Sequence, residues 1–275
     1  MMIRIFLTLM MLVLPFAAHA QEEKETAYDR VIRTGQIDCG YVVYPPFITM
    51  DVNTKKLGGL TVEILEAIGQ ELNLKVNWKE EVTPTTAFEA IKSDRLDVIC
   101  VPFWPTGERM RVSAPTVPLF YAGMYAVVRA GDARFKTYDS FNSESVTIVT
   151  QEGTANQMLV NKGFPKAKKI EEMSMVDPAV LMMDVIAKKA DAAFLEMSTF
   201  KDFDRLHPGK LAVAIDAPYV VEPSHLWLSV GDERLKNMID GAIGILHNHN
   251  EIKKITQKYG GAPSFMPVAR GYESP

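Results

Sequence analysis

The stretch that decides the fold is LDVICVPFWPTGER, residues 96–109. Residues 97–101 are typical of a buried strand, because all but the first of them are apolar, and Arg109 follows beyond its carboxyl end. The later stretch ADAAFLE, residues 190–196, repeats this arrangement with an acid, Glu196, at its end. Each half of the chain is therefore expected to hold a buried strand with one charge just past it.

Strands and helices alternate on both sides of these two stretches. Apolar residues recur at helical spacing over residues 61–72, and Pro45 and Pro46 end the first strand. Strands are expected at residues 37–42, 76–79, 97–101, 145–149 and 192–195, and helices at residues 28–34, 61–72, 87–92, 155–161, 232–248 and 251–259. This alternation favours an α/β fold built on open parallel sheets.

Two extended runs divide the chain into lobes. Residues 125–128 and 225–230 bracket the second series of strands and helices, and we interpret them as crossovers between two lobes. The expected division is residues 27–124 with 223–265 for the first lobe, 125–222 for the second, and 266–275 for a C-terminal tail. Lobes joined by two crossovers are able to hinge open and shut.

The first twenty residues have the pattern of a cleaved export signal. One basic residue, Arg4, precedes an apolar run over residues 5–14, and Ala20 ends a small-x-small triplet. The run is too short to span a bilayer, which needs about 20 apolar residues. No cysteine follows the cleavage point, which argues against a lipid-anchored lipoprotein. We expect a mature, soluble chain that begins near Gln21 in the periplasm.

Composition excludes several other classes. The chain has 47% hydrophobic and 23% charged residues, as ordinary globular proteins do. Its 30 Lys and Arg become 29 once Arg4 is removed, so against 34 Asp and Glu the mature net charge is about −5. No basic cluster predicts nucleic-acid binding. His247 and His249 are too close in sequence to share one helix face, and no carboxylate or cysteine cluster joins them, so no metal site is expected.

The two cysteines, Cys39 and Cys100, both fall in expected strands. Export permits a disulfide, and two buried thiols that pack as small apolar groups are the alternative. Neither cysteine has a histidine nearby in a recognisable catalytic motif.

The ordered motifs together resemble the periplasmic solute-binding proteins of polar amino-acid ABC transporters, family 3. The resemblance extends over essentially the whole mature chain and is carried by YPPF at 44–47, GLTVEI at 59–64, RLDVI at 95–99, TGER at 106–109 and residues 252–260. It implies a type II binding-protein fold with two lobes, each a central mixed sheet flanked by helices, and a ligand cleft between them. It also implies an ABC permease as partner and no cofactor, and we expect a monomer.

The resemblance also assigns the poles of a ligand site. Arg109 would clamp an α-carboxylate, for which a guanidinium fork is better suited than an ammonium group. Glu196 would receive the α-ammonium, as a glutamate does in the related cores of ionotropic glutamate receptors. Gly153 and Thr154 would add donors at a helix start. The alternatives are a helix-terminal acid for Glu196 and a simple N-cap for Thr154.

Three aromatic residues depart from the family pattern. Trp104 stands where a small hydroxyl residue is common, and Tyr41 stands where an acidic or small residue is common. With Tyr44 they are expected either to form an aromatic wall against a flat or cationic side chain or to pack the cleft edge. The sequence therefore leaves the identity of the ligand open.

Three functional hypotheses follow. The first is a binding protein that delivers an amino acid or a similar zwitterion to an importer. The second is a periplasmic enzyme like the cyclohexadienyl dehydratases, with a cleft carboxylate such as Glu196 as general acid. The third is an accessory periplasmic protein with an altered cleft.

Overall fold

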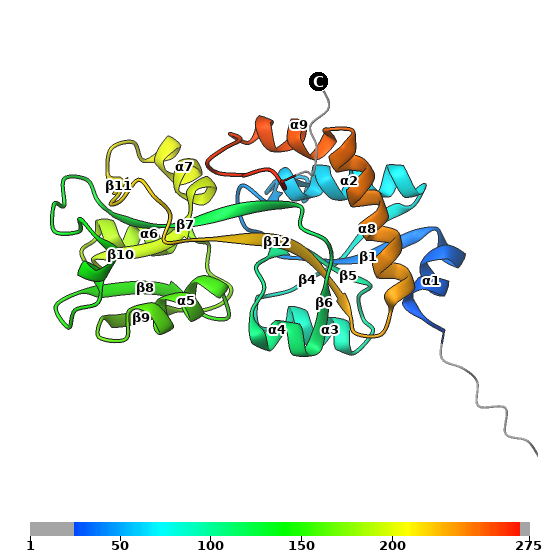
Figure 1. Ribbon diagram of the computed structural model, residues 1–275, viewed down its shortest axis with the longest axis horizontal. Coiled ribbons are helices and arrows are strands. Elements are labelled where there is room, and N and C mark those ends of the chain that lie inside the picture. The colour runs from blue at the N-terminus through cyan, green and yellow to red at the C-terminus, as the bar shows by residue number, and fades with distance from the viewer. Residues whose placement is uncertain (1–24, 270–275) are drawn as a thin grey trace, which may run out of the picture.

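The computed structural model describes residues 25–269 and has two bodies joined by two long strands, β7 (Phe120–Arg129) and β12 (Val220–Ser229) (Figure 1). We call the body with both chain ends lobe 1 and the other lobe 2. The expected signal peptide, residues 1–20, and the end of the expected tail lie outside the described residues. Within residues 25–269 no helix has the length and apolar character needed to cross a bilayer.

Lobe 1 contains a sheet in the order β4-β1-β5-β12. Strands β4, β1 and β5 are parallel, and β12 runs antiparallel to β5. The strands of lobe 1, besides β12, are β1 (Gln36–Tyr41), β2 (Thr49–Met50), β3 (Leu57–Gly58), β4 (Lys75–Glu81), β5 (Val98–Phe103) and β6 (Ser113–Pro115). Its helices are α1 (Ala27–Thr34), α2 (Leu60–Leu72), α3 (Ala87–Lys92), α4 (Gly107–Val112), α8 (Glu233–Asn248) and α9 (Glu251–Lys258).

Lobe 2 continues the same sheet in the order β7-β10-β8-β9, with β11 on the other side of β7. Strands β10, β8 and β9 are parallel, whereas β7 is antiparallel to β10. Its further strands are β8 (Thr147–Gln151), β9 (Lys168–Glu172), β10 (Ala192–Glu196) and β11 (Leu211–Val213), and its helices are the short η1 (Tyr138–Phe141), α5 (Ala155–Gly163), α6 (Ala179–Ile186) and α7 (Met197–Leu206). The purely parallel sheets expected from the alternation are wrong, and the mixed sheets implied by the resemblance are confirmed.

The chain crosses between the lobes as one paired ribbon, just before the residues expected as crossovers, 125–128 and 225–230. Residues 120–124 of β7 pair with residues 220–224 of β12, and beyond this stretch β7 pairs with lobe 2 while β12 pairs with lobe 1. Each long strand therefore belongs to both lobes. The expected lobe boundaries, at residues 124 and 223, fall inside the ribbon and stay a prediction.

The repeated sequence pattern has a repeated structural cause. Asp97 precedes β5, accepts a hydrogen bond from the backbone N–H of Asp38 at 2.8 Å, and pairs with Arg30. Asp191 precedes β10 and accepts from the backbone N–H of Thr147 at 2.9 Å. Each aspartate thus ties the start of one strand to its parallel neighbour, and the two strands leave these clamps in corresponding directions towards the cleft.

Helix starts follow their capping signals. The side chains of Thr26, Thr106, Thr154 and Asp232 each accept a hydrogen bond from the backbone N–H three residues later, which satisfies one of the unpaired donors of a first turn. Two of these caps, Thr106 and Thr154, start the helices that border the cleft. Helix α7 starts directly after Glu196, as the helix-terminal alternative for this residue expected.

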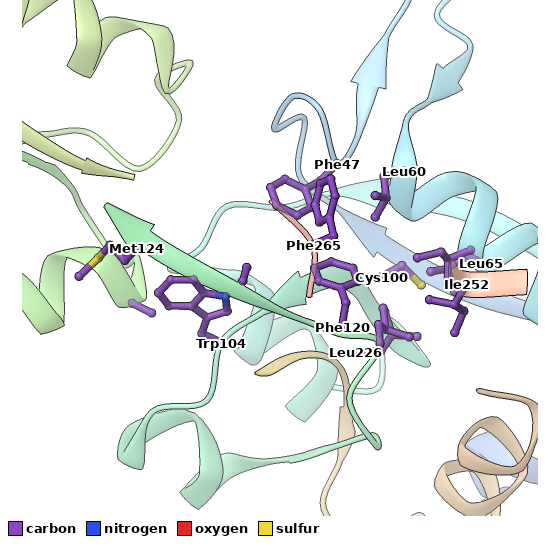
Figure 2. Packing of buried hydrophobic residues seen from close by; sticks show 14 of the residues in the cluster. Phe47, Leu60, Leu65, Cys100, Trp104, Phe120, Met124, Leu226, Ile252 and Phe265 are labelled. Atoms are coloured by element: carbon purple, nitrogen blue, oxygen red, sulfur yellow. The ribbon is translucent and has the colours of Figure 1, made fainter. Parts of the chain in front are cut away.

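The core of lobe 1 extends up to the ribbon. Phe47, Phe120 and Phe265 pack together, with ring centroids 5.2–6.3 Å apart, and Trp104 belongs to the same apolar cluster (Figure 2). A disulfide joins Cys39 of β1 to Cys100 of β5 across a Cα–Cα distance of 5.4 Å, which settles the alternative that the sequence left open. The strands that lead to the cleft therefore start from a tightly packed, cross-linked base.

Candidate functional site

A cavity of about 60 Å³ lies between the lobes. Lobe 1 contributes four aromatic side chains, Tyr44, Phe47, Phe103 and Trp104, the aliphatic residues Val42, Pro84, Val101 and Pro102, and the cation Arg109. Lobe 2 contributes Thr154, Ala155, Asn156 and Glu196. The cavity is thus an apolar chamber with one positive pole and one negative pole, which come from different lobes.

Arg109 is held by backbone groups of both lobes. The backbone N–H of Arg109 donates a hydrogen bond to the side-chain oxygen of Thr106, the N-cap of α4. The Arg109 side chain therefore leaves the first turn of α4 towards the cavity. The guanidinium donates to the carbonyl of Trp104 at 2.7 Å and, across the cleft, to the carbonyl of Gly153 at 3.0 Å. Only 5% of the residue is exposed. These bonds fix the orientation of the fork and couple it to the position of lobe 2.

The electrostatic setting of Arg109 favours an anion. Its guanidinium carbon lies 4.6 Å from the ring centre of Phe103 and 5.2 Å from that of Phe88. Burial lowers the pKa of Arg109 to about 10, because the charged form has lost much of its hydration. Among residues 25–269 the side chain forms no salt bridge. A buried cation without a paired acid is stabilised strongly by an anionic ligand.

Glu196 is the opposite pole. It ends β10 and stands at the start of α7, where its carboxylate accepts a hydrogen bond from the hydroxyl of Tyr44 in lobe 1 at 3.3 Å. Burial raises the pKa of Glu196, although hydrogen bonds to the side chain act in the other direction. Within the described residues Glu196 also makes no salt bridge, so a cationic group in the cavity would stabilise its charge.

Gly153 and Thr154 form a turn of lobe 2 that contacts lobe 1. Gly153 has a φ of 76°, and a Cβ there would lie 2.7 Å from Cγ2 of Thr85. Thr154 accepts from the backbone N–H of Gln157 and donates to the carbonyl of Gln151 at 2.7 Å. Thr154 therefore is an N-cap, as the alternative expectation had it, and it also lines the cavity.

The structure brings most of the expected site residues together. Arg109, Glu196, Thr154, Trp104 and Tyr44 line the cavity, and Gly153 reaches it through its carbonyl. Tyr41 does not line it. Its ring packs edge-on against Trp78 at 6.2 Å, as the packing alternative expected.

Eight cavity residues were not expected from the sequence, among them Phe47, Phe103 and Asn156. Phe47 is the last residue of the YPPF turn, and Phe103 lies two residues beyond the strand expected at 97–101. Asn156 is buried, and its amide donates to the carbonyl of Phe194 at 3.1 Å. Its position two residues after the cap Thr154, on the first turn of α5, was the available signal.

The comparisons with known proteins agree with this geometry. The chain matches the family of bacterial extracellular solute-binding proteins, family 3, over residues 37–262, and it belongs to that family. A relative from Haemophilus influenzae, described as a "Probable amino-acid ABC transporter-binding protein", is 23% identical over 236 residues, which cover 85% of this chain and 88% of the relative.

Solved structures share the two-lobed fold. The chain is similar to ArgBP from T. maritima, with a TM-score of 0.74 and 23% identity over 85% of this chain and 99% of that one. It is also similar to the ancestral amino acid-binding protein AncCDT-1, a precursor of cyclohexadienyl dehydratase, with a TM-score of 0.76 and 22% identity over the same shares. A further structure of ArgBP is arginine-bound.

Proposed function

We propose that the protein captures a free amino acid, or a zwitterion of similar shape, for the membrane permease of an ABC importer. The observation that carries this proposal is the pair of opposite charges, Arg109 and Glu196, that line one cavity from opposite lobes and form no salt bridge among residues 25–269. A zwitterion supplies a partner for each charge and draws the lobes together. The names of the relatives, as amino-acid transporter-binding proteins, support the same function.

The proposal has three further parts. The chain is exported, loses residues 1–20 and works in the periplasm as a monomer. It binds its ligand without changing it. The N-terminal residue of the purified periplasmic protein, expected at Gln21, tests the export, and sedimentation of that protein tests the monomer.

The direct test is a thermal-shift screen of the mature protein against the natural amino acids, opines and betaines. A ligand that binds only the folded state raises stability by RT ln(1 + [L]/Kd), or about 2.7 kcal/mol at a hundred times Kd. At least one amino acid should raise the melting temperature in a concentration-dependent way. A screen without any such shift would contradict the proposed function.

The roles of the two poles are tested with Glu196→Gln. This variant keeps the shape and removes the charge, so an amino acid should bind it about tenfold more weakly, a loss of about 1.4 kcal/mol. The deaminated analogue of that amino acid is the control, because it has no ammonium group to lose. If both compounds respond equally, Glu196 does not bind the ammonium group.

A second candidate function is an enzyme of the dehydratase kind. The buried contact between Tyr44 and Glu196 and the similarity to a precursor of cyclohexadienyl dehydratase favour it. A protonated Glu196 would then act as general acid. Incubation with prephenate or arogenate decides, since turnover of either compound would establish the enzyme and its absence would leave the binding function.

A further inference from the structure

We infer that the ligand carries an uncharged, apolar side chain, an inference that rests on the proposed function and narrows it. If Arg109 and Glu196 hold the two charges of the amino-acid backbone, the rest of the cavity must receive the side chain. Apart from the phenol of Tyr44, the described residues that line this remainder carry no ionisable group, and much of its wall consists of Phe47, Phe103 and Trp104.

The hydroxyl groups of the cavity and the Asn156 amide already donate hydrogen bonds within the protein. The Asn156 amide donates to the carbonyl of Phe194, the Thr154 hydroxyl donates to the carbonyl of Gln151, and the Tyr44 hydroxyl donates to Glu196. A charged ligand side chain would lose its hydration here without gaining a partner of opposite charge, which disfavours its binding. An apolar side chain is instead stabilised by its removal from water.

Glu81 and Asp177, unlike Glu196, do not line this cavity. A second, smaller space of about 40 Å³ shares Val42, Tyr44 and Pro84 with the first and is lined by the exposed Glu81. Asp177, also exposed, accepts a hydrogen bond from the backbone N–H of Ala179 at the start of α6. A lysine or arginine side chain would have to pass the Tyr44 ring before it met Glu81.

Calorimetry with matched pairs of ligands tests the inference. The pairs are L-norleucine with L-lysine, L-citrulline with L-arginine, and L-glutamine with L-glutamate, which differ mainly in side-chain charge. The neutral member should bind about tenfold more tightly in every pair, and norleucine most tightly of the six. Equal or tighter binding of lysine or arginine overturns the inference and leaves the proposed function intact. If the Glu81→Gln variant then lost that preference, Glu81 would be the group that binds the cationic side chain. If no amino acid binds at all, the proposed function fails as well.

A charge placed in the cavity gives an independent readout. Val42→Glu adds a carboxylate to the apolar wall, and Val42→Gln is the neutral control of the same shape. The ratio of arginine to citrulline affinity should rise about tenfold in Val42→Glu and stay unchanged in Val42→Gln. The inference is overturned if the ratio in Val42→Glu does not move, because this wall would then not face the ligand's side chain.

Discussion

At the scale of single residues, the guanidinium of Arg109 is held in one defined orientation. It is buried, it faces two aromatic rings, and its donors on one side are fixed by the carbonyls of Trp104 and Gly153. An anion that meets the remaining donors forms charge-assisted hydrogen bonds where water competes little. A geometry this constrained explains why a lysine would not be equivalent.

Arg109→Lys should weaken binding of the ligand by about 1.5–3 kcal/mol, because it replaces a planar fork with one point charge. Titration calorimetry of the wild type and the variant measures the loss. Arg111→Lys, on the exposed side of the same helix, is the matched control and should bind normally. Unchanged affinity in Arg109→Lys would remove Arg109 from the carboxylate site.

Glu196 makes the ligand-free protein less stable near neutral pH. Burial raises the pKa of this carboxyl above its ordinary value, so the folded state binds its proton more tightly than the unfolded state does. The resulting stability is fully present below about pH 4.5 and is lost as the pH rises through the raised pKa.

Glu196→Gln should therefore melt a few degrees higher than the wild type at pH 7 without ligand, and the difference should shrink towards pH 4. For a protein of this size 1 kcal/mol corresponds to about 2–4 °C. Scanning fluorimetry across this pH range tests the sign, with Glu152→Gln, on an exposed residue, as the control. A lower melting temperature for Glu196→Gln at pH 7 would contradict the burial argument.

At the scale of elements, lobe closure depends on the turn between β8 and α5. Gly153 has a positive φ, its carbonyl accepts from Arg109, and its Cα faces Thr85 of lobe 1. The hydroxyls of Thr85 and Ser174 meet beside it at 3.5 Å. This turn is thus the point where lobe 2 rests on lobe 1.

Gly153→Ala should weaken ligand binding about tenfold or more, because its Cβ would lie 2.7 Å from Thr85 and hold the lobes apart. It should also cost about 1 kcal/mol of stability, from the positive φ alone. Gly131→Ala is the matched control, since Gly131 has a φ of 80° but no atom within 4 Å of an added Cβ. If the two variants bind ligand equally well, contact at Gly153 does not limit closure.

Some of the strands could be predicted from the sequence and others could not. The strands before Arg109 and Glu196 were predictable because both faces are buried and their residues are almost all apolar. Strand β9, Lys168–Glu172, was missed because it pairs only with β8 at the sheet edge, where charged residues are tolerated.

The candidate site was predictable to a similar degree. Its two charged poles follow from their place at strand ends. Tyr41 lies outside the cavity because its ring packs against Trp78, and Asn156 lines the cavity while its amide donates to the carbonyl of Phe194. No local sequence pattern encodes these long-range contacts.

At the scale of the whole molecule, the two lobes meet through few contacts besides the ribbon of β7 and β12. The cross-cleft hydrogen bonds of Arg109, Tyr44 and Thr85 are made by residues that line the cavity or its edge. A ligand that touches both lobes therefore stabilises the closed arrangement by its own contacts.

Small-angle scattering should show a smaller radius of gyration when the ligand identified by calorimetry is added, because the ligand-free protein samples open states. Arg109→Lys at the same ligand concentration should show less compaction than the wild type. A radius that does not change with a bound ligand would contradict the hinge.

The place of β12 in the sheet also sets the order in which the protein matures. Everything that pairs in lobe 2 has been synthesised by Val213, whereas lobe 1 must wait for residues 220–229 to insert a strand between β5 and β7. When the exported chain emerges N-terminus first on the far side of the membrane, lobe 2 can complete its hydrogen bonds while lobe 1 is still missing the strand between β5 and β7. Lobe 1, which begins first in the chain, is therefore completed last, and the protein can bind its ligand only once the C-terminal segment is in place.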